Sequence, residues 1–172
     1  ILQALLALGL FAFWWAGFAE SNAAPDLDAL APRRLARAYL EVALHAGFRA
    51  YALPSALTYG AIFVFIAGSS FAYMDVLGVS SARYGVLFSL GVSGYLLGTV
   101  VCRALLRRIG VDRALRIGLA LTAVGGVGLW VCVQAGRGSV PVVLGAQFVV
   151  MLAHGINQPC AQSSALGPFG AR

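Results

Sequence analysis

The chain has 172 residues, of which 60% are apolar and only 10% are charged, and its mean hydropathy is +0.87. A water-soluble domain is about 45–50% apolar and about 25% charged, so this composition excludes an ordinary soluble domain and favours a membrane protein. The net charge of +6 comes from arginines that lie between apolar stretches. We therefore attribute the charge to membrane topology and expect no nucleic-acid partner.

Five stretches of the chain are long and apolar enough to cross a membrane as helices. A bilayer core about 30 Å thick requires about 20 apolar residues in helical conformation. In lipid each stretch has to satisfy its backbone hydrogen bonds internally, and none shows the alternating pattern of a membrane strand. We therefore predict an all-α fold, a polytopic transmembrane helical bundle, with spans at residues 1–19, 50–74, 84–106, 114–136 and 140–166.

Residues 20–49, between the first and second spans, are rich in charge and form a predicted linker. Pro32 suits the first position of a helix, because its φ is fixed and its missing N–H is not needed there. Beyond it, Leu35, Tyr39 and Val42 fall on one helical face, with arginines elsewhere on the surface. Two readings stay open, a helix lying on the membrane surface and an ordinary solvated linker helix.

The distribution of arginine predicts the orientation. With alternating spans, ten arginines fall on the side of residues 20–49, 103–116 and the C-terminal tail, and two fall on the other side. Short loops rich in arginine stay cytoplasmic. We therefore expect residues 20–49 and 103–116 to be cytoplasmic.

The span at residues 140–166 carries the strongest polar signal. Its side chains on or beside one helical face are Gln147, Met151, His154, Asn157 and Gln158. We expect Gly155 and Pro159 to break the helix, because a proline removes a backbone donor, and a broken span at membrane depth is typical of a binding site. The polar face therefore predicts a cavity that contacts solute, with hydrogen bonding between helices as the alternative.

A second face with cavity-lining candidates lies in the span at residues 50–74, where Ser55, Tyr59 and Phe63 follow helical spacing. The aromatic rings could stack on a lipophilic or cationic solute, and simple packing is the alternative. His154 is titratable in the middle of a span, and an ordinary imidazole pKa of about 6.5 is compatible with proton transfer. A lone histidine also commonly serves a neighbour's hydrogen bond. None of the five spans contains an acidic residue.

Small residues four apart predict close helix packing at Gly94 and Gly98, and again at Gly118, Thr122 and Gly126. The three cysteines have no metal-ligand spacing, so we expect small buried thiols, no metal site and no cofactor. The sequence has no motif of a serine hydrolase, a P-loop or a zinc protease. We therefore expect no enzyme activity.

Three stretches together carry a family resemblance. They are Phe65-Ile-Ala-Gly-Ser-Ser-Phe71 with Leu77-Gly-Val-Ser80, Tyr84-Gly-Val-Leu-Phe88 with Arg107-Arg-Ile-Gly110, and Gly155-Ile-Asn-Gln-Pro159 with Ser164-Ala-Leu-Gly-Pro-Phe-Gly170. They resemble the major facilitator superfamily, and within it the Bcr/CflA type of drug:proton antiporter, over spans six to ten of the twelve-span pattern.

The charged segment around residues 98–113 resembles the superfamily's cytoplasmic loop motif. Its matching residues are Gly98, Arg103, Arg107, Arg108, Gly110 and Arg113. Cys102 stands where the family has an aspartate, and Leu105 replaces the second glycine. Independently of the resemblance, these arginines could reach helix C-terminal carbonyls and latch helix ends, or serve as topology charge alone.

The resemblance implies part of the major facilitator fold in the inner membrane of a cell. It implies proton-coupled efflux of drugs or other small hydrophobic compounds by alternating access, with the seventh and tenth spans lining the cavity. The implied partners are the lipid bilayer, a small-molecule substrate, protons as coupling ion, and further helices of the same polypeptide. The chain lacks an initial methionine and ends just after a span, so we expect a fragment, with the proton-carrying acid in a first span outside it. The alternatives are a carrier for a native metabolite such as a sugar, amino acid or siderophore, and a membrane scaffold that transports nothing.

Overall fold

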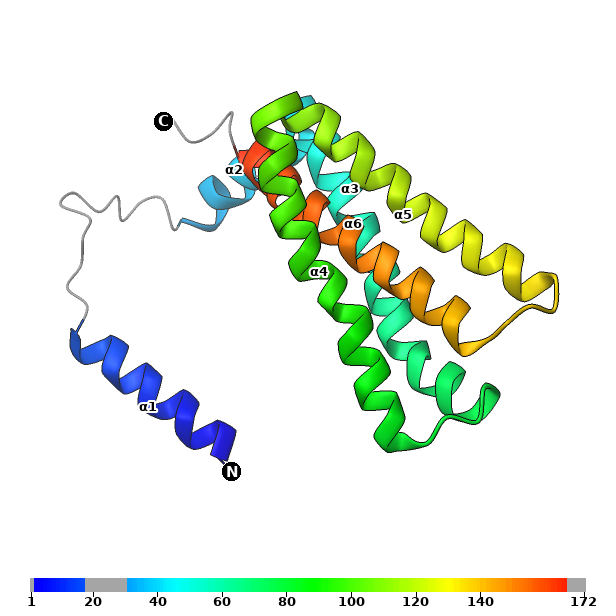
Figure 1. Ribbon diagram of the computed structural model, residues 1–172. Helices are drawn as coiled ribbons and strands as arrows, with labels where there is room; N and C mark the ends of the chain where they lie inside the picture. The colour runs from blue at the N-terminus through cyan, green and yellow to red at the C-terminus, as the bar shows by residue number, and fades with distance from the viewer. Residues whose placement is uncertain (1, 18–30, 167–172) are drawn as a thin grey trace. The chain divides into compact units, whose positions relative to one another are not determined.

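The computed structural model describes residues 2–17 and 31–166, and its regular structure within these residues is helical (Figure 1). The prediction of an all-α helical bundle is therefore confirmed for this part of the chain. The chain divides into two units, Ile1–Glu41 and Val42–Arg172, and each is described by itself.

The first unit contains α1 (Leu2–Gly17), and α2 (Pro32–Leu44) begins in it. The 16 residues of α1 are strongly apolar, and at a rise of 1.5 Å per residue they span about 24 Å. The remaining residues of the predicted span 1–19 lie outside the described part. α2 starts at Pro32, and a single residue outside both helices, His45, separates it from α3.

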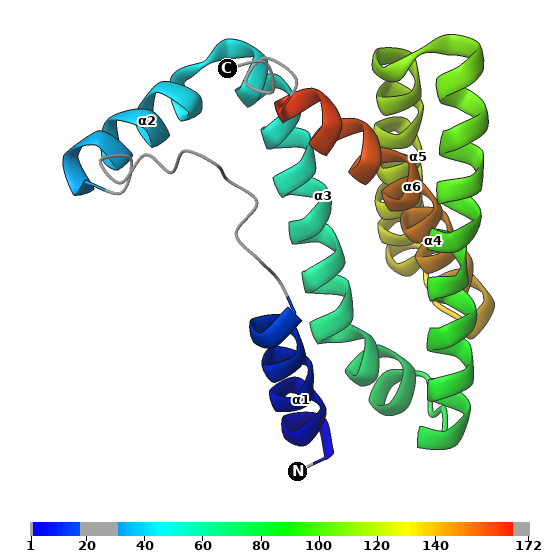
Figure 2. The same ribbon diagram turned by 90° about the vertical axis from the view of Figure 1, so that its left-hand side faces the viewer.

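The second unit is built on four helices that are long and apolar enough to cross a membrane. They are α3 (Ala46–Ser70), continued by the π-helix η2 (Phe71–Val76), then α4 (Ser81–Ile109), α5 (Val111–Gln134) and α6 (Val140–Leu166). α6 packs against each of the other three (Figure 2). This arrangement makes α6 the helix around which the unit is assembled.

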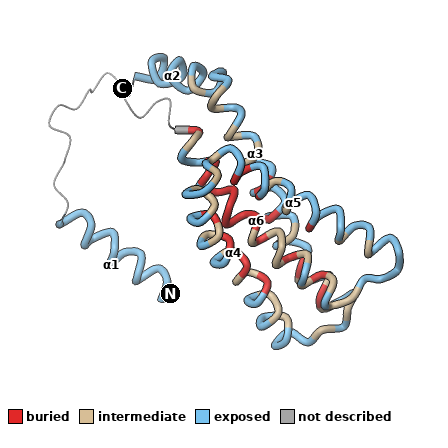
Figure 3. Tube along the Cα trace, turned by 45° about the horizontal axis from the view of Figure 1, so that its top comes forward, coloured by how far each residue is buried: buried red, intermediate tan, exposed pale blue. Residues whose placement is uncertain are grey.

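The second unit buries polar side chains and exposes large apolar ones. Gln147, His154, Asn157 and Gln158 of α6 are buried, whereas α5 exposes large apolar side chains such as Trp130. Figure 3 shows the buried residues gathered along α6 and on the sides of its neighbours that face it. A bilayer favours this distribution, because lipid accepts apolar side chains while polar groups need partners inside the protein.

The predicted cytoplasmic loop around residues 103–116 is not a loop, which corrects the expectation from the sequence. α4 runs to Ile109 and α5 starts at Val111, so one residue, Gly110, makes the connection with a φ of +78°. A left-handed φ strains any residue with a Cβ, and glycine accepts it at no steric cost. At 29 residues α4 is about 43 Å long, which leaves its arginine-rich last turns beyond a bilayer core of about 30 Å. The linker is also shorter than expected, because α3 already begins at Ala46.

Glycines form the contact between α4 and α6. A methyl group added at Gly94 would lie 2.5 Å from the carbonyl oxygen of Phe148, and one added at Gly155 would lie 2.9 Å from Cα of Gly98. The close packing predicted at Gly94 and Gly98 is confirmed. Gly98 therefore lies within α4 and inside the bundle, not in a connecting loop.

The packing face of α5 differs by one residue from the prediction. Gly118 is buried against the side chain of Asn157, as expected. Further along, Gly125 faces α6, whereas Gly126 is exposed, and a methyl group added there would have no atom within 4 Å. Adjacent residues on a helix point about 100° apart. The spacing of small residues alone therefore could not decide whether Gly125 or Gly126 faces α6.

Candidate solute-binding site

α6 carries the candidate site as one continuous helix. We expected Gly155 and Pro159 to break it, and that expectation was wrong: the helix runs through both from Val140 to Leu166. Proline lacks an N–H, so the carbonyl of Gly155 loses its usual donor four residues on. Gly155 meanwhile lies directly against the backbone of Tyr95 and Gly98 on α4. The glycine therefore serves the close approach of α6 to α4, and the helix continues through the proline.

Rings from two neighbouring helices contact the imidazole of His154 on α6. The imidazole lies 4.9 Å from the ring of Tyr59 on α3, edge to face, and 5.6 Å from the ring of Tyr95 on α4, measured between ring centroids. Phe63 stacks on Tyr59 at 6.4 Å. We call Tyr59, Phe63, Tyr95 and His154 the aromatic cluster. It joins α3 and α4 across α6 in the middle of the spans.

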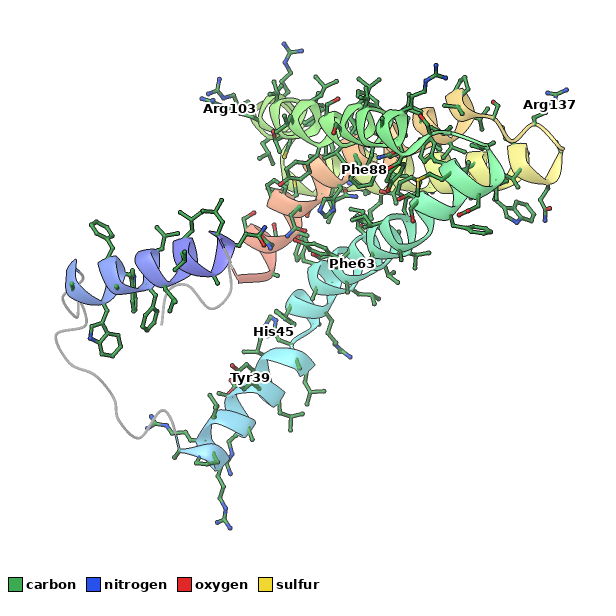
Figure 4. The ribbon with its side chains drawn as sticks, turned by 90° about the horizontal axis from the view of Figure 1, so that it is seen from below. Tyr39, His45, Phe63, Phe88, Arg103 and Arg137 are labelled. Carbon is green, nitrogen blue, oxygen red and sulfur yellow. The ribbon has the colours of Figure 1, made fainter. Side chains whose placement is uncertain are left out.

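The face of α3 that packs on the bundle is rotated by about one residue from the predicted face. Thr58, Ile62 and Ser69 are buried, whereas Tyr59 and Phe63 lie at the edge, 38% and 65% exposed. Figure 4 shows Phe63 on α3 and Phe88 on α4, the two helices that flank α6. The predicted aromatic residues therefore border an open side of the second unit.

A hollow of about 550 Å³ lies between the first half of α3 and the second half of α6. Its walls are formed by Phe48, Tyr51, Ala52, Ser55, Ala56, Tyr59, Ala161, Gln162 and Ala165. The hydroxyl of Ser55 donates to Oε1 of Gln158 at 3.5 Å beside it. We call this the α3–α6 hollow. Its volume falls in the range of about 300–1,000 Å³ typical of ligand pockets, and Tyr59 belongs both to its wall and to the aromatic cluster.

A larger hollow of about 680 Å³ lies at the other end of the unit, lined by residues around Gly78, Arg83 and Val140. No buried polar side chain contributes to its wall. Binding pockets combine apolar walls with a few convergent polar groups. The α3–α6 hollow meets this description better, because two of its wall residues contact buried polar side chains. Ser55 hydrogen-bonds to Gln158, and the ring of Tyr59 contacts His154.

Gln147 does not join the aromatic cluster. Its Oε1 accepts a hydrogen bond of 3.2 Å from the hydroxyl of Tyr73, and its Nε2 donates to the carbonyl of Phe88 at 3.2 Å. Tyr73 is fully buried and belongs to the π-helix η2, and Ser69 and the hydroxyl of Tyr84 form a further contact of 2.8 Å nearby. Gln147 thus ties α6 to η2 and α4.

The other predicted residues of α6 are also buried. Nδ2 of Asn157 donates to Oγ1 of Thr122 on α5 at 3.3 Å, and its side chain fills the space that Gly118 leaves. Met151 is 5% exposed and belongs to the core. The predicted set therefore separates into two groups. Ser55 and Tyr59 line the hollow, with Gln158 bonded to Ser55 and with His154 and Phe63 in ring contact with Tyr59. Gln147 and Asn157 instead connect helices.

The arginines of the predicted loop motif lie on the surface of helix ends. Arg103, Arg107 and Arg108 are exposed on α4, and Arg113 is exposed on α5. Arg107 and Arg108 occupy the last turn of α4, where a positive charge is favoured by the helix dipole. In Figure 4, Arg103 on α4 and Arg137, in the connection between α5 and α6, lie toward opposite ends of the bundle.

Two contacts that the sequence did not suggest complete the site. At the arginine-rich end, the hydroxyl of Tyr51 donates to Oδ1 of Asp112 at 2.6 Å, joining α3 to the start of α5. Tyr95 faces His154. Its spacing could have identified Tyr95 as part of this face, because Tyr84, Phe88 and Tyr95 follow one another at helical intervals of four and seven. No sequence signal pointed to the pairing of Tyr51 with Asp112.

The side chains of the candidate site suit non-covalent recognition. Aromatic faces offer stacking, and Ser55, His154 and Gln158 offer hydrogen bonds. Among the described residues there is no group of three or more His, Cys, Asp or Glu side chains placed to hold a metal ion.

The family model described as MFS/sugar transport protein matches residues 1–164 of the chain. A protein of Haemophilus influenzae, named bicyclomycin resistance protein homolog, is 23% identical over 100 residues. This alignment covers 58% of the chain and 25% of that protein, so the chain matches about a quarter of the relative's length. No solved structure matches.

Proposed function

Because this chain belongs to the major facilitator superfamily, we propose that it forms part of a transporter that carries small solutes across the membrane by alternating access. The solute would bind at the aromatic cluster and the α3–α6 hollow. The observation that carries the proposal is the position of Tyr59, which lines the hollow and contacts the buried His154. Midspan sites lined by facing helices are typical of transporters built from helical repeats.

For the solute we propose drugs or other small hydrophobic compounds. The relative's name, bicyclomycin resistance protein homolog, supports this class. The composition of the site supports it too, because residues 50–70, 84–102 and 140–165 contain no Asp, Glu, Lys or Arg. A strongly charged solute would need an opposite charge at membrane depth.

For the energy source we propose proton coupling, with export driven by inward proton flow. The resemblance to drug:proton antiporters supports it, and the acid that carries the proton would lie in helices outside this chain. One charge moved across 100 mV supplies about 2.3 kcal/mol.

A sugar carrier is the second candidate, favoured by the description of the matching family as MFS/sugar transport protein. The hydroxyl of Ser55 and the amide of Gln158 beside the hollow could hydrogen-bond a polyol, and Tyr59 could stack on a sugar ring.

The chain is a multi-pass membrane protein, and we propose the inner membrane as its location. Residues 20–49 and 103–116 would face the cytoplasm. The support is the concentration of arginine at one end of α4 and α5, under the rule that positive segments stay inside. We propose three parts for the chain: the end of an N-terminal bundle, the linker, and four spans of a C-terminal bundle.

Export of a fluorescent dye by the full-length protein, with and without a protonophore, tests these proposals. We expect export that stops when the proton gradient collapses, and no accumulation of radiolabelled hexose. Tyr59→Ala should reduce export at least fivefold, whereas Leu57→Ala, on the exposed side of α3, should leave it unchanged. Export that persists without the gradient excludes proton coupling, and hexose uptake without dye export favours the sugar carrier.

A further inference from the structure

His154 has a feature that packing alone does not explain. Its side chain is 8% exposed, yet its Nδ1 atom is buried without a hydrogen-bond partner among the described residues. A buried polar atom that gives up water without gaining a partner is costly. Such atoms are rare in native proteins and call for a specific explanation.

The neighbours of His154 present rings to it. Tyr59 approaches edge to face at an interplanar angle of 75°, and Tyr95 is tilted by 36°. The stretches of α3, α4 and α6 at this depth contain no acidic or basic residue apart from His154. Nδ1 is covered in this structure, so a bound molecule that displaced the side chains covering it would meet aromatic surfaces and one hydrogen-bonding nitrogen.

We propose that Nδ1 of His154 is the specificity-determining contact of the site, and that the site takes an uncharged, planar aromatic solute with a hydroxyl group. The inference rests on the proposed transport function and names the solute class. The ring system of the solute stacks on Tyr59 and Phe63, whose own rings are stacked. Its hydroxyl bonds to Nδ1, which a hydroxyl can do as donor or acceptor, whichever tautomer the imidazole adopts.

Nile red and 2-hydroxy Nile red are suitable probes. Both are planar and uncharged, and only the second carries a hydroxyl group. Binding to the purified full-length protein is measured by fluorescence against empty micelles, and export is measured separately in cells. His154→Phe keeps a ring between Tyr59 and Tyr95 but removes the nitrogen, whereas His154→Asn keeps a polar atom at similar reach. His45→Phe, at the start of α3, controls for loss of an imidazole elsewhere.

We expect the unaltered protein to bind the hydroxylated dye three- to tenfold more tightly than Nile red, as one hydrogen bond in a buried site provides. His154→Phe should abolish this preference, so that the two dyes bind with affinities within twofold of each other. His154→Asn should retain part of it, and His45→Phe all of it.

Equal binding of the two dyes by the unaltered protein, or a folded His154→Phe variant that keeps the preference, overturns the inference. The first of these outcomes needs no variant, so a His154→Phe protein that fails to fold leaves the proposal testable. A protein that binds with the expected preference but exports neither dye rejects the transport function alone. Export of both dyes without preference rejects the role of His154 alone.

Discussion

Gly155→Ala tests the contact on which the bundle depends, the backbone approach of α6 to α4. The new methyl would lie 2.9 Å from both Cα of Gly98 and the backbone nitrogen of Thr99, and it would overlap the carbonyl oxygen of Tyr95. Carbon atoms in ordinary contact lie about 3.5–4.0 Å apart. The two helices would therefore have to separate by roughly 0.6–1.1 Å, because each atom in the way belongs to a backbone rather than to a movable side chain.

Overpacking of this kind costs about 1–3 kcal/mol, and more where the surroundings are rigid. Replacing glycine by alanine inside a helix also contributes up to about 1 kcal/mol of stabilisation. Gly145→Ala is the matched control, because Gly145 lies on the same helix, is exposed, and has no atom within 4 Å of its added methyl. Since both variants carry the same helix-propensity gain, the difference between them isolates the steric cost.

We expect Gly155→Ala to be less stable than Gly145→Ala by at least about 2 kcal/mol. The measurement is reversible unfolding of the protein in mixed micelles by titration with sodium dodecyl sulfate, followed by circular dichroism and tryptophan fluorescence. Equal unfolding midpoints for the two variants would refute the close approach of α4 and α6. A Gly145→Ala variant that is itself strongly destabilised would show that the cost does not come from the Gly98 contact.

Other contacts give further expectations. Gln147→Leu should lower the free energy of unfolding by about 2 kcal/mol, because it leaves the buried hydroxyl of Tyr73 without its acceptor. A decrease of less than about 0.5 kcal/mol in the same unfolding assay would argue against the hydrogen bonds of Gln147. In the native protein, a maleimide should label Cys132 and leave the buried Cys102 and Cys160 unmodified. After denaturation all three cysteines should be labelled. Labelling of all three before denaturation would contradict the burial of Cys102 and Cys160. In otherwise cysteine-free protein, a membrane-impermeant thiol reagent applied to intact cells should modify Arg137→Cys and not Arg107→Cys; the reverse pattern would invert the proposed orientation.

Part of the candidate site could be predicted from the sequence. Polar residues are conspicuous in an apolar span, and the cost of burying them suggested that the face of α6 with His154 was important before any contact was known. The sequence could not separate Asn157 and Gln147, which bond to α5, η2 and α4, from His154 and Gln158, which contact wall residues of the α3–α6 hollow. That division depends on which helix lies opposite each residue.

The faces of the other helices were harder to predict. In a soluble helix, apolar residues mark the buried side, but in lipid both the packed side and the exposed side are apolar. The prediction therefore placed Tyr59 and Phe63 on the facing side of α3, where the structure buries Thr58 and Ile62 instead. The break expected at Pro159 did not occur either, since α6 continues through it while Gly155 packs on the backbone of α4.

The sequence by itself determined that the chain is a membrane protein made of helices, and it determined where the four long helices lie. These properties are local, since the bilayer fixes the length of an apolar span and lipid compels its backbone to bond within the span. Only the tertiary structure decided that α6 is the central helix, that Tyr95 meets His154, and that Gly155 touches the backbone of α4. Such pairings join residues far apart in the chain, and they follow from the rotation of each helix about its axis, which an apolar sequence in an apolar solvent barely constrains.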